Sequence, residues 1–119
     1  MRVFERGNRI NFVDDNNVFV GFDNESYCCE HWGYMVTEKI PTEVDEDLKI
    51  AATGYNFDTK FFAEPKNTVD DYSEDNMATF RLVKDDKELF LTLFNCHNGY
   101  YGHGFEAKIN GIDWKTGLL

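Results

Sequence analysis

Hydrophobic and polar residues alternate over many short stretches of the chain, and this period of two predicts β-strands. Ile10 and Phe12 alternate with polar neighbours, and Val18, Val20 and Phe22 share one face a few residues later. The four residues 14–17, Asp-Asp-Asn-Asn, lie between these stretches, and such residues favour tight turns because they bond to their own main chain. A β-hairpin over residues 10–22 is therefore predicted.

The clearest pattern lies between residues 79 and 94. Residues 79–82 alternate, and 85–87 have the composition of a turn. In the next stretch the odd positions 89, 91 and 93 are all Leu, while the even positions 90, 92 and 94 are Phe, Thr and Phe. Apolar residues on both faces indicate a strand at the centre of a sheet that is covered on both sides.

Two further turns are predicted from Asn-Gly pairs, which are a strong hairpin signal. Asn98-Gly99 follows the Leu-rich stretch, and Asn110-Gly111 follows an alternating segment over residues 105–109. Residues 112–119 then form a short final strand or a tail.

The middle of the chain gives weaker signals. A short strand is expected over residues 34–37, and Ile40-Pro41 ends it because proline lacks a backbone donor. Residues 42–47 form either one helical turn capped by Thr42 or a loop, and 48–53 and 57–63 are weaker strand candidates. Residues 64–76 carry Pro, Asn, Ser and several acids, so they are expected to form a surface loop.

Together these elements predict a mainly β domain spanning residues 1–119, either an antiparallel sandwich or a partly open barrel. An α+β domain with one short helix is the alternative. With 42% hydrophobic and 16% aromatic residues, the chain has enough apolar material for a folded core.

Net charge narrows the classes of partner. The chain carries 12 Lys and Arg against 22 Asp and Glu, a formal charge of −10. Such a surface repels phosphate backbones, so direct contact with nucleic acid through a basic face is not expected. The acidity serves either solubility or attraction to a basic partner.

The three cysteines and the N-terminus predict a location. An odd cysteine count with two adjacent members argues against a disulfide framework. The first residues form no apolar signal region, and no stretch is long and apolar enough for a membrane span. A cytoplasmic protein with reduced thiols and no membrane contact is expected.

All cysteines and histidines lie in two short windows of the chain. The first window contains Cys28, Cys29 and His31, and the second contains Cys96, His97 and His103. Thiolate and imidazole are the ligands that zinc prefers, but this spacing matches no common zinc motif. Buried cysteines also pack as small hydrophobes, so no metal, cofactor or catalytic residue is assigned.

A thiol nucleophile with His97 as its base is the second chemical reading of the windows. Glu30 adjoins the thiols, and the negative field of the chain raises a thiol pKa instead of lowering it. The chain also contains no Gly-rich phosphate loop, Cys-x-x-Cys pair or His-Glu-x-x-His motif. These features argue against an enzyme.

A binding site suits the same windows better. Tyrosines on a tight hairpin tip supply rigid contact area at low entropic cost, although they can equally cover the end of the core beside a β-bulge. The candidate binding residues are Cys28, Cys29, Glu30, His31, Asn98, Tyr100, Tyr101 and His103.

Two motifs carry a family resemblance. With its Cys28-Cys29-Glu30 and Asn98-Gly99-Tyr100-Tyr101 motifs, the chain resembles small phage- and prophage-encoded proteins of unknown function. Members of that family often have serine at the position of His103 and need not have Cys96 or His97. The resemblance implies a mobile-element setting, a bacterial host cytoplasm and an accessory role, and it implies no activity.

The sequence thus predicts a non-enzymatic binding module that contacts a host protein or a small molecule, for example as an inhibitor of a host protein. A metal- or thiol-dependent hydrolase using the two windows is the alternative. A self-associating virion or assembly component is a third reading, and the oligomeric state is left open.

Overall fold

The computed structural model describes residues 1–25, 30–63, 75–97 and 102–119, and these residues form nine β-strands and no helix. The mainly β prediction is confirmed, and the α+β alternative with a short helix is wrong for the described residues. None of them belongs to a helix that is long and apolar enough to cross a membrane.

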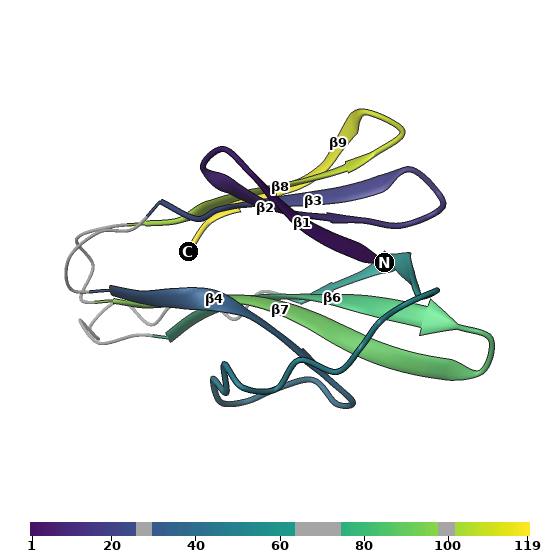
Figure 1. The fold of residues 1–119 in the computed structure, drawn as a ribbon, viewed down its shortest axis with the longest axis horizontal. Helices are drawn as coiled ribbons and strands as arrows, with labels where there is room; N and C mark the ends of the chain where they lie inside the picture. The colour runs from purple at the N-terminus through teal and green to yellow at the C-terminus, as the bar shows by residue number, and fades with distance from the viewer. Residues whose placement is uncertain (26–29, 64–74, 98–101) are drawn as a thin grey trace.

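The strands form two open antiparallel sheets that face each other as two layers (Figure 1). The sandwich form of the prediction is therefore correct, and the sheets do not close into a barrel. The first sheet has the order β1-β2-β3-β8-β9, with bounds Arg2–Arg6, Arg9–Val13, Val18–Asp23, Gly104–Ile109 and Ile112–Leu118. The second has the order β4-β7-β6-β5, with bounds Glu30–Thr37, Lys87–His97, Asp75–Lys84 and Asn56–Ala63.

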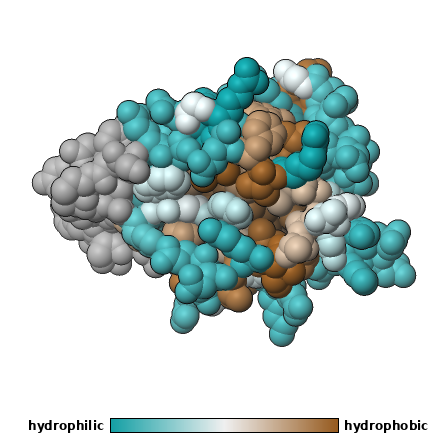
Figure 2. Space-filling model, viewed as in Figure 1, coloured by the Kyte–Doolittle hydropathy of each residue, from teal (hydrophilic) through white to brown (hydrophobic). Residues whose placement is uncertain are grey.

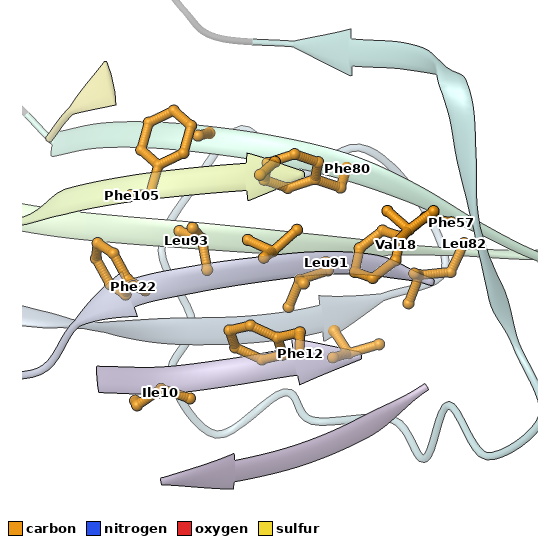
Figure 3. Packing of buried hydrophobic residues seen from close by; sticks show 14 of the residues in the cluster. Ile10, Phe12, Val18, Phe22, Phe57, Phe80, Leu82, Leu91, Leu93 and Phe105 are labelled. Atoms are coloured by element: carbon orange, nitrogen blue, oxygen red, sulfur yellow. The ribbon is translucent and has the colours of Figure 1, made fainter. Parts of the chain in front are cut away.

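The core lies between the two sheets (Figure 3). The first sheet contributes Phe12, Val20 and Phe22, and the second contributes Phe80 and Leu91; all five are fully buried. Burying each such side chain contributes about 1.5–3 kcal/mol. On the face shown in Figure 2, hydrophilic residues cover most of both layers, and hydrophobic residues gather where the layers meet.

Strand β7 has the two-sided burial that its sequence predicted. Leu89, Leu91 and Leu93 are at most 4% exposed and belong to the core between the sheets. Phe90 and Phe94, on the opposite face, are at most 5% exposed. The core covers one face, and Phe61 and His31 contact Phe90 and Phe94 on the other. Because β7 lies between β4 and β6, its main chain is also paired on both sides.

Tight turns connect neighbouring strands where Gly or Asn adopts a left-handed backbone conformation with positive φ. Asn110 and Gly111 both have positive φ, 53° and 79°, as a type I′ hairpin between β8 and β9 requires. Gly7, with φ of 61°, begins the two-residue turn between β1 and β2. Strand β1 was not predicted from the sequence, because this Gly-Asn pair is a weak signal for a hairpin there.

Asp14 joins the first sheet to the second. Its Oδ1 accepts the backbone N–H groups of Asn16 and Val18, each at 2.9 Å, which fixes the turn between β2 and β3. Its Oδ2 accepts the N–H of Phe57 at 2.8 Å, at the start of β5. The carboxylate is buried, so one side chain satisfies three main-chain donors from both layers.

In the middle of the chain, the strand predicted over residues 48–53 is wrong, and the loop predicted over 64–76 ends earlier than expected. Strand β6 already begins at Asp75, so residues 75 and 76 do not belong to the expected surface loop, and residues 64–74 lie outside the described part. Residues 48–53 are not a strand, because only Lys49 forms an isolated parallel bridge, to Val36. Residues 42–47 are a loop and not a helical turn.

Candidate functional site

The segment 38–50 folds back onto the free edge of β4. Val36 donates its N–H to the carbonyl of Leu48 at 2.8 Å, and Ile50 donates to the carbonyl of Val36 at 3.1 Å. Both main-chain groups of Val36 are thereby used, since the other edge of β4 faces β7. The segment therefore covers part of an edge that would otherwise expose unpaired groups.

Side chains hold the same segment against the outer face of β4. The Asp45 N–H lies 3.4 Å from the sulfur of Met35, and the Thr37 hydroxyl donates to the carbonyl of Lys39 at 2.6 Å. His31 Nε2 lies 2.8 Å from a carboxylate oxygen of Glu46. His31, Met35 and Thr37 share one face by strand alternation, so these contacts follow the strand along its length.

A cavity of about 540 Å³ lies between this segment and β4. Its size falls in the range of small-ligand sites. Five lining residues are apolar, namely Met35, Ile40, Pro41, Leu48 and Ile50. The remaining lining residues are Thr37, Glu38, Lys39, Thr42, Glu43 and Asp45. We call these eleven residues the β4 pocket.

The charge at the β4 pocket is negative. Glu38, Glu43 and Asp45 carry three carboxylates, and Lys39 is the one cation among the eleven lining residues. The apolar lining remains accessible, since Ile40 is 50% exposed and Leu48 is 45% exposed. An accessible apolar floor beside carboxylates attracts a ligand that is both apolar and cationic.

A second cavity, of about 520 Å³, lies on the first sheet and is less suited to binding. Its lining includes two arginines, Arg6 and Arg9, and two acids, Asp23 and Glu106. Arg9 and Glu106 already neutralise each other at 2.7 Å. The balanced charge and the mostly polar lining leave no strong preference for any ligand class.

The two predicted windows do meet in the fold. Strands β4 and β7 pair so that Glu30 lies opposite His97 and His31 lies opposite Cys96. The described ends of the two windows are therefore direct neighbours. Cys28, Cys29, Asn98, Tyr100 and Tyr101 lie outside the described residues.

The fold separates His31 from His103. His31 is on the outer face of β4, where its ring lies 5.7 Å from that of Phe94. His103 is fully buried and stacks on Trp32 with ring centroids 5.0 Å apart. Consecutive strand residues point to opposite faces, so the side chains of His31 and Trp32 lie on opposite faces of the second sheet. His103, which stacks on Trp32, therefore lies on the face opposite to His31.

His103 has contacts that anchor the end of the sandwich. Its Nδ1 lies 2.7 Å from the carbonyl oxygen of Asp23, and its main chain exchanges two hydrogen bonds with Leu119. Asn95, also fully buried, donates to the carbonyl oxygen of Leu119 at 3.0 Å. These contacts place His103 in the packed interior and away from the β4 pocket.

The described part of the chain contains no set of side chains arranged as ligands for a metal ion. Among those residues, no group of three or more His, Cys, Asp or Glu side chains is arranged to hold a metal ion. Neither His31 nor Cys96 lines the β4 pocket. The described residues do provide an apolar cavity that three carboxylates also line.

None of the residues that line the β4 pocket was predicted from the sequence as a binding residue. Its apolar members Ile40, Leu48 and Ile50 are isolated in an acidic stretch, where they give no strand or helix period. Aliphatic residues scattered through an exposed, charged segment were the available signal. The main-chain bonds to Val36, together with the contacts of Asp45 and Glu46, bring them together over Met35.

Comparison with known families supplies an assignment. A family model described as a domain of unknown function, DUF7448, matches residues 1–107. The chain belongs to the DUF7448 family. The matched range includes all of the β4 pocket and eight of the nine described strands at least in part. No curated protein and no solved structure shows significant similarity to this DUF7448 chain.

Proposed function

We propose that this DUF7448 chain is a non-enzymatic binding module, an accessory protein of phage or prophage type that engages a host protein through the β4 pocket. The observation that supports this most is the cavity of about 540 Å³ with an aliphatic floor and three carboxylates at its rim. The net charge of −10 adds a long-range attraction for a basic partner.

The β4 pocket is held in shape before any ligand arrives. The two backbone hydrogen bonds at Val36 and the contacts of Asp45 and Glu46 fix the covering segment. A preformed site loses less conformational entropy on binding, which favours recognition.

The hydrolase alternative has less support. His31 faces the carboxylate of Glu46, and both side chains are more than half exposed to solvent. An exposed imidazole paired with a carboxylate gives little support to a catalytic role for His31, and Cys28 and Cys29 lie outside the described residues. No second function is therefore proposed.

Affinity capture with matched variants tests the proposal. Tagged wild-type protein, Leu48→Glu and Ile112→Glu would be exposed to lysate of the bacterium that carries the gene. Ile112 is 72% exposed on β9, in the other sheet, so it controls for adding a charge to an exposed aliphatic position. The wild type and Ile112→Glu are expected to retain the same protein at about one-to-one stoichiometry, and Leu48→Glu is expected to lose it.

The purified partner then decides the outcome. Saturable binding to the wild type, weakened about tenfold or more by Leu48→Glu alone, would support the proposal. A wild-type protein that retains no stoichiometric partner would refute a binding function. Equal retention by all three proteins would refute the β4 pocket as the site.

A further inference from the structure

Three polar groups at the β4 pocket are already hydrogen-bonded within the chain. The hydroxyl of Thr37 already donates to Lys39, and the N–H of Asp45 is directed to Met35. The N–H of Leu48 donates to the carbonyl of Asp45 at 3.2 Å. These three groups are therefore not available to orient a bound molecule, and the charged side chains of the lining remain.

The lining also disfavours anionic ligands. Glu38, Glu43 and Asp45 repel phosphate and carboxylate groups, and Lys39 offsets one of the three charges. A cationic group at the rim gains attraction from the same carboxylates. The chemistry of the rim thus specifies lysine or arginine.

The floor specifies an aliphatic group. Met35, Ile40, Pro41, Leu48 and Ile50 include no aromatic ring, and the fully buried Met35 lies beneath the accessible aliphatic residues. Since Ile40 and Leu48 remain about half exposed, the floor is reached from the surface and accepts a side chain inserted by a partner.

The main chain of β4 at Val36, beside the pocket, is not available for strand addition. Both the N–H and the carbonyl of Val36 are bonded to the segment 48–50, so a partner cannot extend the sheet there. Recognition therefore depends on side chains.

Resting on the proposed function, we infer that the β4 pocket accepts an aliphatic side chain flanked by lysine or arginine residues on a partner protein. The aliphatic side chain covers Ile40 and Leu48, which are about half exposed, and the flanking cations approach Glu38 and Glu43. This combination assigns the partner a basic segment with a single apolar anchor.

Three blocked pentapeptides test the ligand class by calorimetry. The first has leucine at its centre and lysine at the other four positions, the second replaces the leucine with glycine, and the third replaces the lysines with glutamate. The leucine–lysine peptide is expected to bind about tenfold or more tightly than the glycine peptide, because burial of the leucine is lost. The glutamate peptide is expected not to bind.

Charge variants test the rim with the same leucine–lysine peptide. Glu43→Lys is expected to weaken binding several-fold, and Asp113→Lys, an equal charge change on β9, is expected to leave it within about twofold. Raising salt from about 20 to about 500 mM is expected to weaken binding to the wild type, since exposed charges are then screened.

The outcomes separate this inference from the proposed function. Equal binding of the leucine and glycine peptides, or equal effects of Glu43→Lys and Asp113→Lys, would overturn the inferred ligand class. If partner capture nevertheless depends on Leu48, the binding function stands with another ligand. A protein that neither captures a partner nor binds any peptide overturns both.

Discussion

Asp14 gives the sharpest test of how this sandwich is held together. In Asp14→Ala, the backbone N–H groups of Val18 and Phe57 lose their acceptors at 2.9 and 2.8 Å. Both hydrogen bonds are buried, so each unsatisfied donor costs about 1–3 kcal/mol. The free energy of unfolding is expected to fall by about 2–6 kcal/mol, a large part of the stability of a small domain.

Asp14→Asn separates shape from acceptor capacity. The amide keeps one oxygen but must direct its NH₂ group at a main-chain donor, so the free energy of unfolding is expected to fall by about 1–3 kcal/mol. Asp15→Ala is the matched control, because the neighbouring Asp15 is exposed and its only described bond uses the backbone, its N–H donating to Asn56 at 3.2 Å. The control is expected to stay within about 0.5 kcal/mol of the wild type.

Urea unfolding followed by tryptophan fluorescence measures all three variants. Trp32 and Trp114 both pack across the layers, with ring distances of 6.3 Å to Phe22 and 5.7 Å to Phe80. Their emission therefore reports on separation of the sheets. An unfolding free energy of Asp14→Ala within about 0.5 kcal/mol of the wild type, or an equal loss in Asp15→Ala, would contradict the reasoning.

Three further predictions concern other parts of the fold. A backbone hydrogen bond from Lys60 and the Arg81 guanidinium lower the pKa of Asp58, so the stability that the Asp58 carboxylate contributes is lost as pH falls below about 4. Asp58→Asn should flatten that part of the pH–stability curve, and an unchanged curve would exclude this contribution of Asp58. Gly111→Ala should destabilise by about 1–2 kcal/mol in urea unfolding because φ is 79° there, and no loss would contradict the turn assignment. His31→Ala should change stability by less than about 1 kcal/mol yet speed amide exchange over residues 45–48; unchanged exchange would show that the contact with Glu46 does not hold the segment.

Much of the strand content follows from the sequence because a β-strand needs only a period of two. The hairpin over residues 10–22, the two-sided strand over 89–94 and the Asn110-Gly111 turn are local patterns, and the structure confirms all three. The mainly β class follows from the same alternation.

The candidate site was less predictable from the sequence. Alternation shows which residues share one face of a strand, but it does not show which other segment packs against that face. Sequence placed His31 and His103 in one candidate site, whereas strand geometry directs them to opposite sides of the second sheet. The apolar members of the β4 pocket are separated by charged residues and show no period. No local rule could have joined them.

The sequence by itself determined where most of the strands and turns lie, since these depend on neighbours along the chain, and that the chain is acidic, since this depends on composition. Only the tertiary structure decided that β3 pairs with β8, that β4 pairs with β7, and that segment 38–50 closes over Met35. These pairings join residues far apart in sequence, and their free energy comes from burial and main-chain bonding that exist only once both strands are in place.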